Sequence, residues 1–382
     1  MSKKYDYIIA GAGLAGLSLA YRIRKEKKLD GLRILLLDRD QKNKNDRTWC
    51  FWSQRTDVFD HLIHKRWPKI RFASQNLNKS YSISPYDYRM IRGIDFYTHC
   101  FDFLTQCPNT FFINDTIENI EQSKNSVTVN CSGQEFECDY LFKSYPEPFD
   151  TNKNHFVWQH FKGWFIETAN DSFDTNEATF MDFRVRQEDE TRFFYVLPTT
   201  EKKALIELAV FSKEIPDPSF YDPFLKEYIE KTLGIQSYSI NEVELGAIPM
   251  TNQKFSQNKA SRIINTGTNA GQVKPSSGFA FIRIQREMQR LFEYIRDNKV
   301  DQYLAESGRY QFYDSIFLNS ILTGKTTGET VFEKLFNKIS PQNIFRFLDE
   351  EGGFINDLKI FTAPPTVPFI HAFFEELLNK IK

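Results

Sequence analysis

A glycine-rich turn after a short apolar run constrains the fold of this chain more than any other feature. Residues 6–16 read DYIIAGAGLAG, in which Gly11, Gly13 and Gly16 form the pattern G-x-G-x-x-G. In a strand–turn–helix unit, the first glycine permits the tight turn and the second lets the backbone approach a pyrophosphate. The third lets the helix pack closely on the strand. The pattern therefore predicts a dinucleotide-binding turn.

The segments after the turn strengthen this prediction. A helix-like segment runs to about Lys28, and its first N–H groups, at Leu14 and Ala15, are expected to face a phosphate. A second apolar run, Ile34–Leu37, ends at Asp38, about where an acid that binds a ribose hydroxyl is expected. A glycine turn in an ordinary α/β unit is the alternative.

Composition excludes several classes of protein. Among 382 residues, 49 Lys and Arg balance 50 Asp and Glu, so there is no basic surface for nucleic acid. The five cysteines form no C-x-x-C pair, which favours reduced thiols in the cytoplasm, and no cluster has the spacing of metal ligands. No run of about 18 apolar residues is available to span a membrane. The aromatic content of 15%, with 37 Phe, suits a thick apolar core or an apolar ligand channel.

The order of the segments suggests an interrupted first domain. Residues 1–150 and 258–300 are predicted to form one discontinuous dinucleotide-binding domain, because a strand and glycine loop near 262–278 lead back to it. Residues 151–257 contain alternating runs that predict an inserted antiparallel sheet, which we expect to bind the substrate. Residues 301–382 form a helical, Phe-rich C-terminal region.

Two carboxyl residues stand out in the predicted antiparallel sheet. Glu207 is the single charged residue in the run ALIELAV at 204–210, although a glutamate facing solvent from a half-buried strand gives the same pattern. Asp182 lies among aromatic residues in the run FMDFR at 180–184, and an ion pair with Arg184 or Arg186 is its alternative.

Several stretches together resemble the lycopene cyclase family of flavoproteins, in its bacterial β-cyclase branch. They occur in the family's order: DYIIAGAGLAGLSLA (6–20), DRTWCFW (46–52), WQHFKGW (158–164), FMDFR (180–184), GAIPM (246–250) and KPSSGF (274–279). The later stretches are more specific than the glycine motif, which many flavoproteins share.

This resemblance implies an α/β fold with a Rossmann-type FAD-binding domain, an inserted antiparallel β-sheet substrate domain and the helical C-terminal region. It implies FAD, active in its reduced form, with NAD(P)H as the electron source. The substrates it implies are lycopene and other linear carotenoids, and the reaction is the non-redox cyclisation of their ends to β-ionone rings.

The resemblance also assigns site residues. Protonation of an alkene needs a neutral acid, which burial favours, so Glu207 is expected to be the acid and Asp182 to assist it or to accept the ring proton. Further cofactor contacts are expected from Arg47 and from the second glycine loop, at Gly267, Gly271, Pro275 and Gly278.

An insoluble substrate suggests contact with a bilayer. The tail 368–382 carries apolar residues at helical spacing and is expected to bind a membrane surface, or else to pack on the protein. We therefore expect a cytoplasmic protein peripherally associated with the inner membrane. An FAD-dependent aromatic monooxygenase of the hydroxybenzoate hydroxylase type is the alternative enzyme, and a carotenoid-binding flavoprotein with a structural FAD is the alternative without catalysis.

Overall fold

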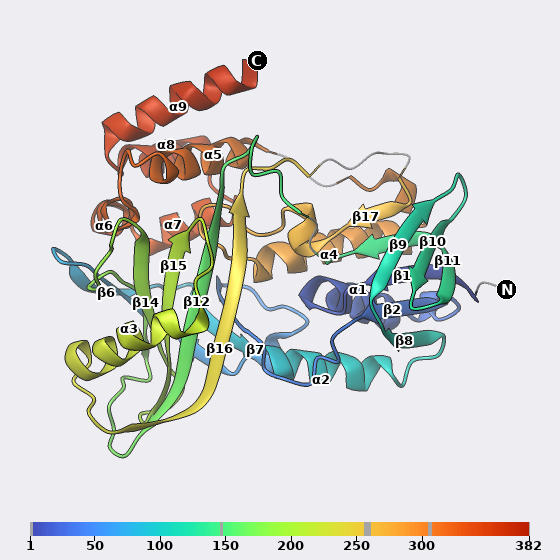
Figure 1. The fold of residues 1–382 in the computed structure, drawn as a ribbon, viewed down its shortest axis with the longest axis horizontal. Coiled ribbons are helices and arrows are strands. Elements are labelled where there is room, and N and C mark those ends of the chain that lie inside the picture. Colours follow the sequence, from blue (N-terminus) through green and yellow to red (C-terminus); the bar gives the residue numbers. More distant parts are fainter. Residues whose placement is uncertain (1–2, 146–147, 256–260, 305–307, 382) are drawn as a thin grey trace.

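A computed structural model describes residues 3–145, 148–255, 261–304 and 308–381. Its fold is mixed α/β, as predicted. Two seven-stranded sheets stand side by side with a small three-stranded sheet, and the C-terminal helices cover one end of the second sheet (Figure 1).

The first sheet contains the glycine turn. β1 (Lys3–Ala10) lies between β2 (Ile34–Asp38) and β11 (Gln134–Lys143), parallel to both, and α1 (Leu14–Lys25) connects β1 to β2. The chain returns to this sheet late, because β17 (Ile263–Asn265) pairs in parallel with β11. The remaining strands are β8 (Thr110–Asn114), β9 (Ile117–Gln122) and β10 (Val127–Cys131).

The second sheet is largely antiparallel, and its strands have the order β16-β12-β15-β14-β13-β5-β6. Five strands come from the predicted insert: β12 (Phe156–Thr168), β13 (Glu177–Asp182), β14 (Thr191–Pro198), β15 (Lys203–Ser212) and β16 (Tyr238–Thr251). The other two, β5 (Lys69–Ala73) and β6 (Asn78–Ser82), extend the sheet through a parallel pairing of β5 with β13. The sheet therefore takes residues from within 1–150 and does not begin at residue 151.

The small sheet lies between these two parts. β7 (Asp87–Arg92) pairs with β3 (Thr48–Ser53) and with β4 (Lys65–Trp67), and α2 (Gly93–Leu104) follows it directly. The aromatic run after β2 is thus β3.

Most of the larger helices follow the last strand. Of the helices that pack on the sheets, α4 (Phe281–Arg296) comes after β17 and packs on α1, whereas α3 (Asp222–Glu227) comes before β16 and lies on the second sheet. The C-terminal helices are α5 (Arg309–Leu322), α6 (Gly328–Lys338), α7 (Pro341–Leu348), α8 (Phe354–Thr362) and α9 (Thr366–Ile381). In the described ranges, no helix is both long and apolar enough to cross a bilayer.

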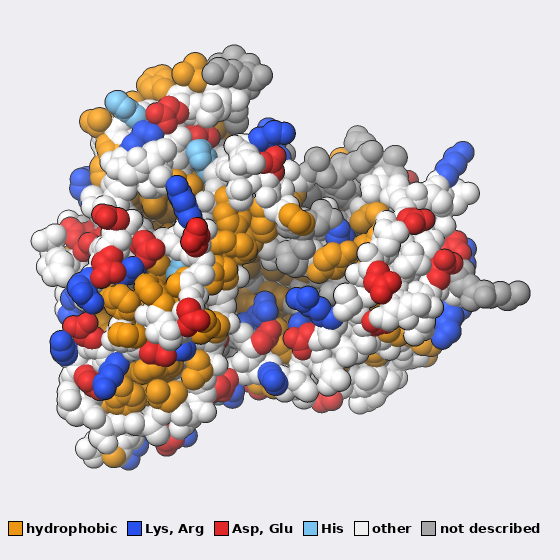
Figure 2. All heavy atoms as spheres, in the orientation of Figure 1, with side chains coloured by type: hydrophobic (Ala, Val, Ile, Leu, Met, Phe, Trp, Pro, Cys, Tyr) orange, Lys and Arg blue, Asp and Glu red, His pale blue; other side chains and the backbone are white. Residues whose placement is uncertain are grey.

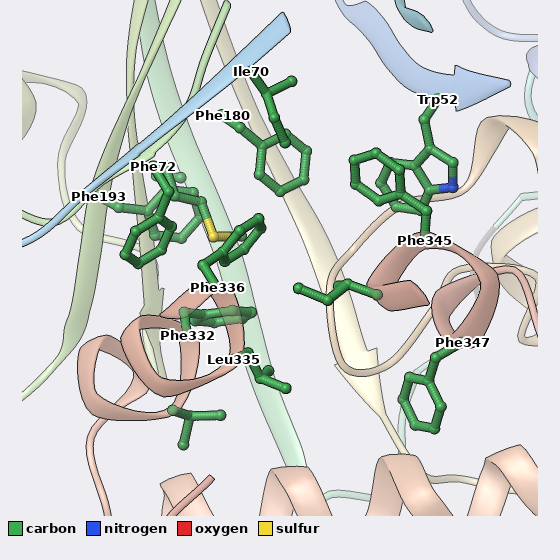
Figure 3. Packing of buried hydrophobic residues seen from close by; sticks show 14 of the residues in the cluster. Trp52, Ile70, Phe72, Phe180, Phe193, Phe332, Leu335, Phe336, Phe345 and Phe347 are labelled. Carbon is green, nitrogen blue, oxygen red and sulfur yellow. The ribbon is translucent and has the colours of Figure 1, made fainter. Parts of the chain in front are cut away.

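Aromatic rings join the second sheet and the small sheet to these helices. The ring of Phe72 in β5 stacks on Phe336 of α6, with centroids 4.7 Å apart, and Trp52 of β3 stacks on Phe345 of α7 at 4.5 Å (Figure 3). Much of the unusual Phe content therefore forms core between sheet and helices.

Candidate functional site

The glycine turn has the geometry that its sequence requires. Gly11 has φ +104°, in a region that favours glycine. A Cβ at Gly16 would overlap the carbonyl oxygen of Gly11, so this glycine permits the close packing of helix on strand. A Cβ at Gly13 would meet nothing within 4 Å, and Gly13, Leu14 and Ala15 line a cavity at the start of α1.

Asp38 lies directly beside this turn. Its Oδ2 accepts a hydrogen bond from the N–H of Ala12 at 2.6 Å, and Lys42 Nζ lies 3.8 Å away. The predicted acid at the end of β2 therefore contacts the glycine turn itself.

The second glycine loop approaches the first. A Cβ at Gly267 would lie 3.2 Å from the Cβ of Ala15. Gly267 and Gly278 line the same cavity as Gly13, whereas Gly271 packs against Phe255 and Pro275 lies outside the lining. Of the four residues predicted in the second loop, the structure thus places Gly267 and Gly278 beside the first glycine turn, and Gly271 and Pro275 outside the cavity lining.

The cavity has a volume of about 280 Å³ and lies between the first and second sheets. Figure 2 shows apolar side chains gathered along this junction. The two glycine loops, Ser144 and Thr268 form part of its lining. A mostly apolar wall is formed by Phe161, Leu197, Leu205, Leu245, Ile248, Pro249, Phe279 and Phe281.

Two residues of the cavity lining carry polar atoms without a hydrogen-bond partner in the part of the chain that the structure describes. These buried atoms are Gln159 Oε1 and Ser277 Oγ, and a Cβ at Gly278 would overlap Gln159 Oε1. Buried polar groups are normally satisfied, so these atoms are suited to a polar ligand beside the glycine loop. Arg47 also lines the cavity, where its guanidinium donates to Asp46 at 2.8 Å.

Glu207 lies on the apolar wall. Its neighbours in the strand are buried, the side chain itself is half-buried, and it lines the cavity. Among the described residues, none donates a hydrogen bond to its carboxyl. Burial raises the pKa of Glu207 well above its usual value, and the nearby charge of Glu244 raises it further. Both effects favour the neutral form of this carboxyl, which faces the apolar wall of the cavity.

Asp182 lies elsewhere. The Arg184 guanidinium contacts its carboxylate at 2.7 Å, and the hydroxyl of Tyr228 donates to the same oxygen at 2.7 Å. Asp182 does not line the cavity. The structure therefore places it in an ion pair, the alternative that the sequence left open, and not beside Glu207.

Glu244 is a residue that sequence reasoning missed. It is 2% exposed, and burial raises its pKa to about 7, although hydrogen bonds from Thr48 oppose the rise. In the sequence, Glu242 and Glu244 alternate with apolar residues, which is the pattern of a solvent-facing strand edge. That pattern carries no signal that one of the two is buried.

The chain matches the family described as "Lycopene cyclase protein" over residues 6–373. A match over nearly the whole chain shows that the protein belongs to this family, and the predicted resemblance is confirmed. No curated protein matches the sequence significantly.

Solved structures share the fold at low sequence identity. A p-nitrophenol 4-monooxygenase, PnpA from Pseudomonas putida, has a TM-score of 0.59 at 14% identity, with 98% of each chain covered. A geranylgeranyl bacteriochlorophyll reductase-like protein from Thermoplasma acidophilum has a TM-score of 0.58 at 12% identity, covering 98% of this chain and 97% of that one. The halogenase PltM, solved in complex with phloroglucinol and FAD, has a TM-score of 0.56 at 12% identity, covering 90% and 79%.

Proposed function

We propose that this member of the lycopene cyclase family is a lycopene β-cyclase, an isomerase that closes the linear ends of lycopene into β-ionone rings. The products are γ-carotene and then β-carotene, with no net oxidation or reduction. One observation carries the proposal: Glu207 is a carboxyl without a hydrogen-bond donor among the described residues, on the apolar wall of the cavity, where burial raises its pKa.

Glu207 supplies the proton. Its acid form transfers H⁺ to the terminal alkene, whose π electrons form the new C–H bond and leave a tertiary carbocation. A second alkene of the same end attacks this cation and closes the ring. An apolar cavity favours these steps because water would trap the cation.

The same side chain is suited to remove the ring proton. Loss of that proton forms the ring alkene and restores the neutral acid, so the cycle balances. Asp46 is the other carboxyl in the described lining, and it is bound by Arg47 and by the hydroxyl of Tyr97 at 2.9 Å. Glu207 is therefore the free carboxylate at the moment when a base is needed.

Aromatic faces lower the energy of the cation. Trp49, Phe161, Tyr195, Phe279 and Phe281 line the cavity. Rings of this kind attract positive charge by cation–π interaction.

FAD is the proposed cofactor, and the residues present fit it. Gly13 leaves open space, and the amides of Leu14 and Ala15 begin a helix. Ser277 Oγ and Gln159 Oε1 have no hydrogen-bond partner among the described residues. The related fold of PltM binds FAD. When bound and reduced by NAD(P)H, a flavin supplies negative charge that stabilises a cation in a dry cavity.

The proposed site of action is the surface of the inner membrane, on the cytoplasmic side. Exposed apolar residues cluster on α8 and α9, whereas Phe369, Ala372 and Glu376 of α9 are buried against the protein. The exposed set is Phe354, Ile355, Leu358, Val367, Ile370, Phe373, Phe374, Leu377 and Leu378. Such a surface suits binding in the interface, from which lycopene would be taken.

Expression in lycopene-accumulating cells tests the proposal. We expect a product of lycopene's mass, and turnover in deuterated water should add one deuterium per new ring. The second candidate function is that of an aromatic monooxygenase, and the observation behind it is the fold shared with a p-nitrophenol 4-monooxygenase. Oxygen-dependent gain of mass with an aromatic substrate, and no cyclised carotenoid, would establish that alternative.

A further inference from the structure

Two carboxyl side chains lie in one row across the second sheet, on either side of a glycine. Gly163 of β12 pairs with Glu207 of β15 and, on its other side, with Glu244 of β16. Tyr195 of β14 pairs with Glu207 and continues the row. Directly opposed residues place their side chains on the same face of a sheet, so both carboxyls project from one face.

The glycine leaves the space between them open. A Cβ at Gly163 would lie 3.3 Å from Glu207 Oε2 and 2.6 Å from Leu205 Cδ1. The carboxyl of Glu207 therefore leans over Gly163, towards the strand that carries Glu244. Any larger residue at this position would displace it.

The hydrogen bonds of the two carboxyls differ. The N–H and the hydroxyl of Thr48 donate to the two oxygens of Glu244, each at 2.6 Å. Donors stabilise a carboxylate, so they favour the charged form of Glu244, whereas Glu207 has no donor among the described residues. When the two carboxyls hold one proton between them, the negative charge is therefore more stable on Glu244.

The other titratable and charged groups near the two carboxyls are either neutral or already paired. Near Glu207 lie Cys50 of β3, Tyr88 of β7 and Tyr195, and burial raises the pKa of all three, so they stay neutral. Near Glu244 lie two charged groups with partners of their own. Arg47, before β3, contacts Asp46 at 2.8 Å, and Glu242, on the same strand, accepts from Arg92 at 2.8 Å.

We propose that Glu207 and Glu244 share one proton, which resides on Glu207, and that Glu244 is a positioning residue whose negative charge keeps Glu207 in its acid form. Gly163 is the residue that leaves the space between the two strands open to the Glu207 carboxyl. The proton sharing rests on the register through Gly163 and on the hydrogen bonds of Thr48, whereas its catalytic consequence rests on the proposed function.

The pair also explains why the proton returns. Once Glu207 has given its proton to the alkene, two carboxylates face each other across Gly163. Their repulsion disfavours this state, so Glu207 becomes a stronger base for the ring proton. Glu244 needs no contact with the substrate, which agrees with its place outside the described cavity lining.

Infrared titration of the FAD-loaded protein tests the proposal. In glutamate-labelled protein, the acid C=O band absent from Glu207→Gln identifies Glu207. Glu244→Gln should lower the midpoint at which this band disappears by about one pH unit or more. The amide keeps the contact with Thr48, because its oxygen accepts from the N–H and its NH₂ can donate to the hydroxyl. Glu242→Gln, the matched control two residues away, should give no comparable shift.

The order in which the two carboxyls ionise gives a second measurement. In Glu207→Gln, the midpoint of Glu244 should stay close to its native value, because Glu207 is uncharged when Glu244 ionises, and it should lie below the native midpoint of Glu207, whether or not Glu244→Gln folds. In activity, the alkaline limb of the pH profile should move to lower pH in Glu244→Gln by the same amount as the band. A Glu207 midpoint that Glu244→Gln leaves unchanged, or a Glu244 midpoint above that of Glu207, would overturn the shared proton.

A failure of the shared proton and a failure of the proposed function give different results. If Glu207→Gln is inactive and the Glu207 midpoint does not move in Glu244→Gln, the shared proton is wrong and the acid assignment stands. If the Glu207 midpoint moves in Glu244→Gln but the native protein cyclises no carotenoid, the pair stands and the proposed function is wrong.

Discussion

The carboxylate of Glu244 accepts two hydrogen bonds from Thr48, one from the N–H and one from the hydroxyl, both at 2.6 Å. Thr48 begins β3 and Glu244 lies in β16, so this contact joins the small sheet to the second sheet at the wall of the cavity. Two elements separated by much of the chain are thereby fixed next to Glu207.

Loss of the Thr48 hydroxyl should weaken this junction. Thr48→Val keeps the shape but removes a donor to a buried carboxylate, which should cost about 2 kcal/mol of unfolding free energy. Urea denaturation at pH 8 measures the change. Thr48→Ser is the matched control and should lie close to the native protein. Equal stability of the valine and serine variants would show that the hydroxyl contributes nothing.

The two glycines of the first turn should respond differently to larger side chains. Gly13→Val should fold but lose FAD, because its side chain enters the open space at the start of α1. Gly16→Ala should reduce stability by about 1–3 kcal/mol, because its Cβ overlaps the carbonyl of Gly11. Flavin absorbance after purification and thermal unfolding separate the two effects. Full flavin occupancy in Gly13→Val would contradict the cofactor site.

Asp349 should make stability depend on pH. Its carboxyl accepts from Trp52 Nε1 at 2.8 Å, and burial raises its pKa to about 7. The folded protein therefore binds this proton more tightly than the unfolded chain. The contribution of Asp349 is complete below about pH 4 and is lost as pH rises through about 7.

Asp349→Asn does not titrate, so it should gain stability relative to the native protein between pH 4 and pH 8. Denaturation at both pH values gives the two differences. A difference that is the same at both would contradict the raised pKa.

The exposed residues of α8 and α9 should govern membrane binding. Serine at Phe354, Phe374 and Leu378 should lower binding to phospholipid vesicles by about tenfold or more, because each apolar side chain contributes to insertion. These residues are exposed, so folding should be unaffected. Ile240→Ser in β16 removes an exposed apolar side chain elsewhere and should leave flotation unchanged. Equal flotation of all variants would show that these helices do not bind the membrane.

Local patterns in the sequence predicted the first unit and much of the second sheet. The glycine spacing fixed the turn at Gly11 to Gly16, and alternating apolar residues fixed the strands from residue 156 onward. β5 and β6 were missed, because their polar residues resemble a loop and their pairing with β13 is non-local.

The site was predicted only where one residue stands out locally. Glu207 was predicted as a site residue because it is the lone charge on an apolar strand, and the structure places it in the lining of the cavity. Glu244 was missed because its burial depends on Thr48, and its relation to Glu207 depends on a register through Gly163. Asp182 looked similar to Glu207 in the sequence, but Tyr228 and Arg184 bind it away from the cavity.

The turnover of Glu207→Gln with FAD bound tests the central claim most directly. The amide keeps the shape of the side chain but has no proton to give to an alkene. We predict a folded, FAD-loaded protein in which cyclisation of lycopene falls by more than the roughly 10²–10⁴-fold typical of a general acid. Asp182→Asn, measured beside it, should keep most of the activity per bound flavin. Near-normal cyclisation by Glu207→Gln would contradict the account.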